Sequence, residues 1–253
     1  MKPKPQMTLD RVLSRYGLAS RSAARVAIRS GRLKVNGRLV RDPELWVRPN
    51  KDTIQLDGAR LKRARRIYLV FYKPKGVVTS HGDPQGRKTV YDFLGENSSW
   101  VAPVGRLDKD TSGLLLFTND TAFADFITRP DSRVPKTYLV KLNGLAAPEV
   151  IERLRAGVEM KRGDWARPEI VRRVEDRGKY TWLEVVLTEG KNREVRRMVE
   201  AVGFKALKLV RTGIGPLALR GLEVGKWRPL GEGEIRALRS ARPAQSGTSG
   251  QRM

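Results

Sequence analysis

The chain of 253 residues contains no cysteine and a single histidine, His81. Without cysteine, disulfides, thiolate nucleophiles and cysteine-based metal sites are excluded. A Ser-His-Asp triad could form only around His81, and a multi-histidine metal site is excluded. The polar neighbours of His81, residues 80–86, are more typical of a solvated loop. The remaining candidates for acid, base or nucleophile are therefore carboxylates, tyrosine and lysine.

The sequence also lacks a long apolar run, a signal-peptide core and a lipidation motif, so we expect a soluble, cytoplasmic protein without membrane contact. Acidic residues are scarce, because 27 Asp and Glu oppose 51 Lys and Arg and give a formal net charge of +24. With 40% hydrophobic residues, the chain can bury a sizeable core in one large or two unequal domains. This charge is typical of a protein that binds nucleic acid, with an anionic membrane surface as the competing partner.

The first 64 residues hold 16 Lys and Arg against five Asp and Glu. Apolar residues at helical spacing predict one helix from Thr8 and a second from Ser20 to Ser30, and Asn36-Gly37 predicts a tight hairpin. Arginines at every fourth position of the second helix share one face, which we expect to contact RNA; the alternative is an ordinary solvated surface. The side chains expected to bind RNA in this module are Arg11, Arg15, Arg21, Arg25, Arg29 and Lys34.

The most informative stretch is residues 105–120, GRLDKDTSGLLLFTND. Its apolar run, residues 114–117, is too short for a typical helix and fits a buried strand. Asp108 then lies in the loop that enters a core strand, where a rigid element holds its carboxylate while solvent still reaches it. Such a position suits a catalytic carboxylate, although Asp, Lys, Thr, Ser and Gly also form ordinary turns.

The rest of the chain mixes β-prone and helical segments, which predicts an α+β protein. Lys73 and Lys75 follow a strand in a turn where they could touch phosphate, and residues 190–201 predict a basic helix. The other expected helices are 90–94, 122–128, 148–156 and 232–238, and the other expected strands are 53–56, 67–72, 136–142, 170–174, 181–187, 207–210 and 217–219. We expect an RNA-binding domain over residues 7–64, a second domain over residues 65–239, and disordered ends at 1–6 and 240–253.

Four motifs in order, KPKGVVTS, GRLDKDTSGLLLFTND, KTY and GKNREVRRM, resemble the bacterial ribosomal-RNA pseudouridine synthases of the RsuA branch. Residues 9–40 resemble the small RNA-binding domain shared by a small-subunit ribosomal protein, tyrosyl-tRNA synthetases and several RNA-modifying enzymes. The matching positions are Ser20, Arg21, Ala24, Ile28, Gly31, Val35, Asn36 and Gly37. The resemblance implies a helix-pair and hairpin module, then a larger domain with a mixed, mostly antiparallel sheet flanked by helices and a central catalytic cleft.

The same resemblance implies isomerisation of uridine to pseudouridine, which involves no redox step or phosphate transfer and requires neither cofactor nor metal. Asp108 aligns with the essential aspartate, which acts as nucleophile at the sugar or as a base on it. Tyr138 aligns with the tyrosine that stacks on the base and is a candidate for taking its carbon-bound proton. Arg196 aligns with the cation that pairs with the catalytic carboxylate, and Arg106 with the arginine that holds the flipped-out geometry. Taken alone, Tyr138 also fits a packing residue and Arg196 a solvated helix.

Lys136, Lys191 and Arg193 lie in these motifs, and we expect them to bind RNA as well. The expected partner is ribosomal RNA, with large-subunit RNA preferred, or a ribosomal precursor particle, and we expect a monomer. A catalytically inert ribosome-assembly factor would share the basic surface and remains an alternative. A metal-dependent nuclease built on Asp108 and Asp110 is a second alternative, for which the sequence offers no convincing third ligand.

Overall fold

The computed structural model describes residues 6–16, 21–49, 51–61, 65–95, 101–161 and 163–241. The chain divides into two compact units, one of residues 1–68, 96–102 and 117–121 and the other of residues 69–95, 103–116 and 122–253. The predicted N-cap Ser20 and most of the predicted disordered ends lie outside the described residues. Among the helices of the described part, none is both long and apolar enough to span a bilayer.

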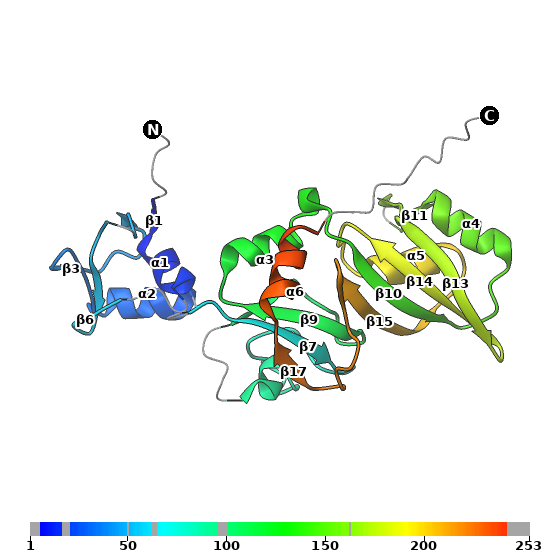
Figure 1. Ribbon diagram of the computed structural model, residues 1–253, viewed down its shortest axis with the longest axis horizontal. Helices are drawn as coiled ribbons and strands as arrows, with labels where there is room; N and C mark the ends of the chain where they lie inside the picture. The colour runs from blue at the N-terminus through cyan, green and yellow to red at the C-terminus, as the bar shows by residue number, and fades with distance from the viewer. Residues whose placement is uncertain are drawn as a thin grey trace. The chain divides into compact units, whose positions relative to one another are not determined.

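The N-terminal unit contains the predicted helix pair and hairpin (Figure 1). Its elements are β1 (Met7–Thr8), α1 (Leu9–Arg15), α2 (Arg21–Arg29), β2 (Leu33–Val35), β3 (Arg38–Val40), β4 (Trp46–Val47), β5 (Ile54–Leu56) and β6 (Ala59–Arg60). The sheet order is β3-β2-β5-β6, and β1 pairs with β4. Asn36 and Gly37 join β2 to β3 with φ of 50° and 80°, the left-handed values that a two-residue hairpin turn requires. The core of this unit comes from the apolar faces of α1 and α2 packed on β2 and β5.

The larger unit is built on a nine-stranded sheet in the order β13-β14-β10-β15-β9-β7-β17, to which β8 and β16 add at β9 and β15. The strands are β7 (Tyr68–Lys73), β8 (Ala102–Val104), β9 (Ser112–Thr118), β10 (Lys136–Leu142), β13 (Ile170–Arg177), β14 (Tyr180–Leu187), β15 (Ala206–Ile214), β16 (Leu217–Ala218) and β17 (Trp227–Pro229). β15 and β9 run parallel, whereas β13·β14, β14·β10, β10·β15, β15·β16 and β7·β17 are antiparallel. The expected mixed, mostly antiparallel sheet is confirmed.

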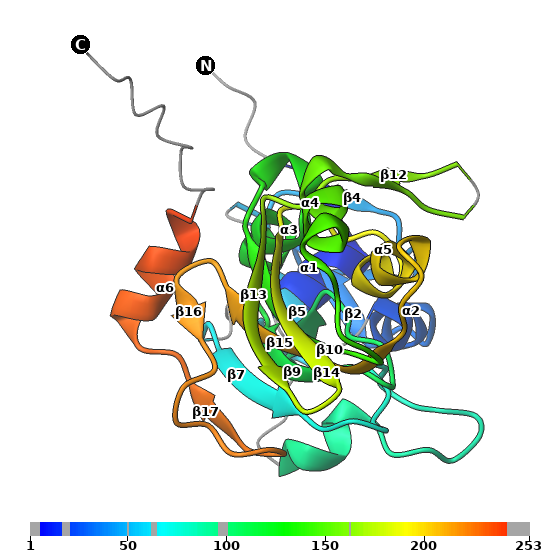
Figure 2. The same ribbon diagram turned by 90° about the vertical axis from the view of Figure 1, so that its right-hand side faces the viewer.

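Helices flank this sheet. They are η1 (Val90–Phe93), α3 (Thr121–Thr128), η3 (Pro130–Ser132), α4 (Pro148–Ala156), α5 (Glu194–Ala201) and α6 (Glu232–Arg239), and a two-stranded ribbon of β11 (Val158–Glu159) and β12 (Trp165–Ala166) lies between α4 and β13 in the sequence. Figure 2 shows α5 and α4 beside β10, β13 and β14. Apolar residues of α4 and α5 pack on Val140, Leu183 and Leu209 in one core cluster. The core thus ties the start of α5 firmly to β10 and β15.

Several sequence predictions differ from the structure. The basic helix begins at Glu194 instead of Gly190, because Arg193 is left-handed (φ 49°) and the Glu194 carboxylate accepts the backbone N–H of Lys191. The strand predicted over residues 114–117 begins earlier, at Ser112, so Gly113 lies inside β9, where a Cβ would sit 2.2 Å from the carbonyl oxygen of Arg211. At the chain end, order extends past residue 239, since Ala241 is buried and donates to Leu238.

Candidate active site

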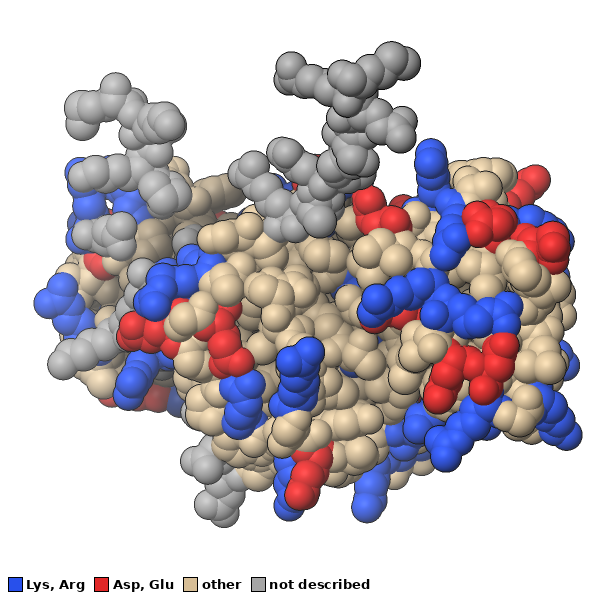
Figure 3. All heavy atoms as spheres, turned by 45° about the vertical axis from the view of Figure 1, so that its right-hand side comes forward, with Lys and Arg blue, Asp and Glu red and all other residues tan. Residues whose placement is uncertain are grey.

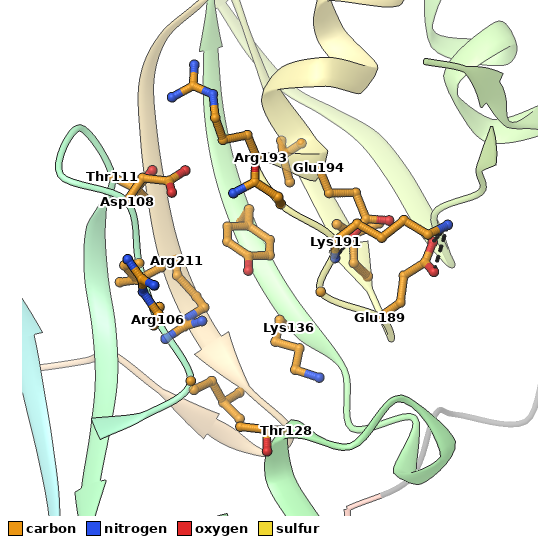
Figure 4. Close-up of a pocket in the computed structure, with 18 of the residues that line it drawn as sticks. Arg106, Asp108, Thr111, Thr128, Lys136, Glu189, Lys191, Arg193, Glu194 and Arg211 are labelled. Atoms are coloured by element: carbon orange, nitrogen blue, oxygen red, sulfur yellow. Dashed lines mark hydrogen bonds and ion pairs between the residues drawn. The ribbon is translucent and has the colours of Figure 1, made fainter. Parts of the chain in front are cut away.

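A cavity of about 470 Å³ opens between the loop after β8, the strands β10 and β15, and the segment that leads into α5. It brings together most of the residues that the sequence predicted for the cleft. Those that line it are Arg106, Asp108, Lys136, Tyr138, Lys191 and Arg193. Figure 4 shows Asp108 and Arg106 on one wall, Arg193 and Lys191 on another, and Lys136 below them. Arg196 is not among the lining residues.

Asp108 is held in place through its backbone by the buried Lys73. The side chain of Lys73 is fully buried, and its Nζ donates to the carbonyl oxygens of Asp108 at 3.1 Å, Thr111 at 2.8 Å and Pro74 at 3.1 Å. Burial lowers the pKa of Lys73 to about 8, and the nearby charges of Asp108 and Asp110 oppose that shift. The expectation that Lys73 could touch phosphate is therefore wrong, because its side chain points into the protein. Only its exposed neighbour Lys75 is available for such a contact.

The other carbonyls of the same loop also have donors. The hydroxyl of Thr79 donates to Leu107 at 2.7 Å, and the backbone N–H of Gly76 donates to Lys109 at 2.7 Å. Arg196 Nη2 donates to the carbonyl oxygen of Asp110 at 2.9 Å. Every carbonyl from residue 107 to 111 is thus bonded, so that the loop is rigid while the carboxylate of Asp108 stays partly exposed to the cavity.

Arg196 acts on this loop in a different way from the sequence prediction. Within the described residues it forms no ion pair with Asp108, and its guanidinium instead bonds the carbonyl oxygens of Asp110 and Ala206. Its pKa is lowered by burial and by the charge of Arg193, while the charges of Asp110 and Asp108 oppose that shift. The positive charge of Arg196 therefore lies near both carboxylates, although its hydrogen bonds go to the backbone.

Tyr138 lies on β10, directly opposite Arg211 on β15. Cross-strand partners project to the same face of a sheet, which explains why both side chains line the cavity. Arg211 in turn pairs with Gly113 on β9, where the missing side chain allows the two backbones to approach closely. Arg211 was not predicted from the sequence, because nothing in the string LKLVRTG separates an inward arginine from an exposed one. The glycine that accommodates it lies 98 positions earlier.

A second group of ionisable side chains lies at the entrance to α5. Glu194 is buried, and burial together with its hydrogen bond to Glu189 raises its pKa. Lys191 pairs with Glu189 at 3.0 Å, as the dashed line in Figure 4 marks. Lys136 is buried as well, and burial and the charge of Arg211 lower its pKa to about 8, opposed by Glu194. Neither Glu194 nor the inward position of Lys136 was evident from the sequence.

The arginines predicted to bind RNA in the N-terminal module are not equivalent. Arg21 and Arg25 both pair with Asp10, at 3.2 Å and 3.0 Å, and Asp10 is fully buried. Burial alone would raise the pKa of Asp10, but hydrogen bonds from Thr8 and the two arginines lower it to about 2. Arg29, Arg11 and Lys34 are exposed, and among the described residues none of these three has an acidic partner; the side chain of Arg15 lies outside the described part.

The basic side chains on the surface of the larger unit do not form one continuous positively charged patch on the face shown in Figure 3. Figure 3 shows basic and acidic side chains intermixed on the right of the view. In the β13–β14 hairpin, Arg172 pairs with Glu184 at 2.7 Å and Arg173 pairs with Asp176. These pairs neutralise each other locally, so the net charge of +24 does not by itself locate an RNA surface on this unit.

Comparisons with known proteins agree with the fold. Residues 67–201 match the family model described as RNA pseudouridylate synthase, and residues 7–52 match the S4 domain. Ribosomal large subunit pseudouridine synthase B of Bacillus subtilis is 38% identical, over 92% of this chain and 95% of its own length. An uncharacterized RNA pseudouridine synthase of Aquifex aeolicus is also 38% identical, over 92% of this chain and 94% of its own. A crystal structure of a pseudouridylate synthase is 30% identical, with a TM-score of 0.67 over 92% of this chain and 99% of its own.

These matches define the class as an RNA-modifying enzyme with an attached RNA-binding domain. The chain belongs to the RNA pseudouridylate synthase family and carries an N-terminal S4 domain. The resemblance stated from the motifs is thereby confirmed. Membership of an isomerase family also decides against the metal-dependent nuclease.

Proposed function

We propose that this protein isomerises one specific uridine of ribosomal RNA to pseudouridine, and that the substrate is large-subunit RNA. The observation that carries the proposal is the convergence of Asp108, Arg106 and Tyr138 on one cavity, with the Asp108 loop held rigid. The named relatives support the choice of RNA: besides the Bacillus subtilis protein, a ribosomal large subunit pseudouridine synthase B of Yersinia pestis is 37% identical over 88% of this chain and 72% of its own.

In the proposed reaction, the target uridine leaves the RNA stack and enters the cavity. Extrusion costs a few kcal/mol, which stacking and backbone contacts must offset. Arg106, exposed on the rim, holds the flipped-out geometry, and Tyr138 packs against the base. Asp108 acts at the ribose, as nucleophile or as base, while the bond between the sugar and the base nitrogen breaks. The base then turns and rejoins the sugar through carbon, without a cofactor or metal.

Arg196 supports this chemistry by its charge and by its bond to the loop. A positive charge near a carboxylate favours the ionised form. The bond to the carbonyl oxygen of Asp110 keeps the guanidinium beside the loop that carries Asp108. We therefore retain Arg196 as the cation that assists Asp108, acting across space instead of through a direct ion pair.

The N-terminal module supplies affinity for RNA. We propose that residues 7–64 form the RNA-binding domain and residues 65–239 the catalytic domain of a monomeric, cytoplasmic enzyme. Basic side chains of the module would contact phosphates, and those around the cavity would position the target strand. The first set is Arg11, Arg15, Arg21, Arg25, Arg29 and Lys34, and the second is Lys136, Lys191 and Arg193.

The test is pseudouridine mapping of total ribosomal RNA from cells with and without this protein. We expect one site to disappear and to return with the wild type but not with Asp108→Asn. Asp110→Asn is the matched control, because its exposed side chain is two positions away and does not line the cavity. The purified Asp108→Asn protein should bind RNA within a few-fold of the wild type. Absence of any missing site would favour the inert assembly factor.

A further inference from the structure

Arg211 is buried at the cavity with part of its guanidinium unpaired. Its side chain is 5% exposed, and Nε donates to the carbonyl oxygen of Leu114 at 2.7 Å. Nη2 is shielded from solvent and has no hydrogen-bond partner. Among the described residues no carboxylate pairs with Arg211. An unpaired donor on a buried cation is unfavourable unless a ligand completes it.

Lys136 is a second buried cation in the same wall. It is 9% exposed, and in the described part of the chain its Nζ makes no hydrogen bond or ion pair. Its pKa is lowered by burial and by the charge of Arg211, which places the two cations within electrostatic reach of each other. Glu194 is the carboxyl group that acts on Lys136, but burial raises its pKa, so its negative charge is reduced near neutrality. The two buried cations of this wall, Arg211 and Lys136, thus have too little fixed negative charge beside them to balance their own.

Strand register relates this cation pair to the residue proposed to pack against the base. Arg211 is directly opposite Tyr138 on the neighbouring strand, and Lys136 lies two positions before Tyr138 on the same strand face. Cross-strand side chains of this kind start about 5 Å apart. A planar ring held against Tyr138 therefore has its edge toward Arg211 and Lys136. In Figure 4 both labelled cations lie along this wall of the cavity.

The ligand must be electron-rich and must reach a buried position. A phosphodiester is tethered on both sides and strongly hydrated, so it suits exposed cations such as Arg106 and Arg193. A flipped base, in contrast, is inserted edge-first into its pocket. Uracil presents two carbonyl oxygens on that edge, and it becomes an anion when it departs with the electron pair of the glycosidic bond.

We propose that Arg211, assisted by Lys136, binds the carbonyl edge of the flipped uracil and stabilises the negative charge that the base acquires when its bond to the sugar breaks. This inference rests on the proposed function. The C1′–N1 electron pair moves onto the base and spreads to its oxygens. When the base rejoins through C5, this charge forms the new C1′–C5 bond. The proton lost from C5 is balanced by the proton gained at N1, so no further reactant is needed.

The experiment uses the full-length protein and a deproteinised large-subunit ribosomal RNA transcript labelled with tritium at uridine C5, because the reaction releases that hydrogen. For Arg211→Gln and Arg211→Met we expect the single-turnover rate of tritium release to fall about 100-fold, the usual effect of removing one oxyanion donor. The Kd for RNA should stay within about threefold, because the phosphate contacts are intact. Lys136→Met should lower the rate about tenfold, in line with a supporting electrostatic role.

Arg211→Lys distinguishes charge from mere packing. Lysine keeps the charge, whereas glutamine keeps only a neutral donor that can still bond Leu114. If Arg211 stabilises the departing base, Arg211→Lys recovers far more rate than Arg211→Gln; if its role is structural, glutamine serves as well as lysine. Lys208→Met is the matched control, since Lys208 is an exposed residue of the same strand outside the cavity.

Several results would overturn the inference. A wild-type rate in Arg211→Gln would do so, as would an unchanged rate with a weaker, less salt-dependent Kd, which would indicate a phosphate contact. If the neutral Arg211 variants fail to fold, Lys136→Met and Arg211→Lys decide. A wild-type rate in Lys136→Met would contradict the inference, and so would a folded Arg211→Lys protein without activity. A wild type that releases no tritium from this transcript would instead count against the proposed function.

Discussion

Replacing the buried Lys73 by methionine should both destabilise the protein and slow its reaction. Methionine keeps most of the side-chain volume but removes Nζ, and with it the bonds to the carbonyl oxygens of Pro74, Asp108 and Thr111. Hydrogen bonds from a charged group contribute about 1.5–3 kcal/mol each, hence roughly 5–9 kcal/mol in total. The cost of burying the Lys73 ammonium group offsets part of this stabilisation. A pKa lowered from 10.5 to about 8 corresponds to a cost of roughly 3 kcal/mol.

The expected net loss for Lys73→Met is therefore about 2–6 kcal/mol of unfolding free energy, or a fall in Tm of roughly 4–24 °C for a domain of this size. Turnover should fall about 100-fold in protein that is still folded, because small displacements of a catalytic group have effects of that order. Circular dichroism melting and tritium release measure the two effects. Lys75→Met is the control, since Lys75 is exposed in the turn that follows β7 and should change stability by less than about 0.5 kcal/mol.

The pH dependence gives an independent check on the same residue. The pKa of Lys73 in the native protein is below its value in the unfolded chain, so between about pH 8 and 10.5 the unfolded chain binds more protons. The stability contributed by this residue therefore rises with pH across that window. The difference in Tm between the wild type and Lys73→Met should widen from pH 8 to pH 10. A difference that shrinks, or a variant with wild-type Tm and turnover, would refute the role assigned to Lys73.

Three further perturbations test other parts of the structure. Arg29→Gln should lower the slope of log K for RNA binding against log salt by about 1 without changing Tm, because Arg29 is exposed. Arg25→Gln should also lower Tm, because it loses its bond to the buried carboxylate of Asp10. Filter binding and melting curves compare the two variants, and equal Tm values would contradict the expected difference. Glu194→Gln should gain stability relative to the wild type as pH rises above about 4.5. The raised pKa of Glu194 makes the native wild type hold a proton that its unfolded chain releases, so the wild type loses stability over this range. A difference in Tm between the two proteins that is constant with pH would contradict this. Gly113→Ala should leave little soluble protein, because its Cβ would meet the backbone of Arg211 at 2.2 Å; a soluble variant with wild-type Tm would show that β9 and β15 can separate without cost.

Local patterns predicted most of the secondary structure. The bounds of β10 and α4 agree with the sequence prediction, since a β-rich run and a proline-started amphipathic segment are signals carried by neighbouring residues. The start of α5 was placed four residues too early. Residues 190–193 have good helical composition, but the left-handed Arg193 and the side-chain bond of Glu194 set the boundary. Such capping contacts are weakly visible in sequence.

The candidate site could be predicted only where a motif carried it. Asp108, Tyr138 and Arg106 were identified from the motifs, and the structure brings all three to one cavity. Lys73 was noticed but misinterpreted as exposed, because a turn with two lysines is usually solvated. Arg211 was missed altogether. Burial of a cation depends on acceptors supplied by distant segments, and no local pattern encodes those acceptors.

The sequence by itself determined the class of protein and its two-part organisation, and it located the motifs that carry the proposed reaction, because these depend on composition, short-range periodicity and strings of neighbouring residues. Only the tertiary structure decided how those residues work together. The contact between β9 and β15 brings Gly113 against Arg211, places Arg211 opposite Tyr138, and leaves the loop of Asp108 to be held by Lys73 from another strand. Each of these contacts joins segments tens of residues apart, so its energy arises only when the chain has folded.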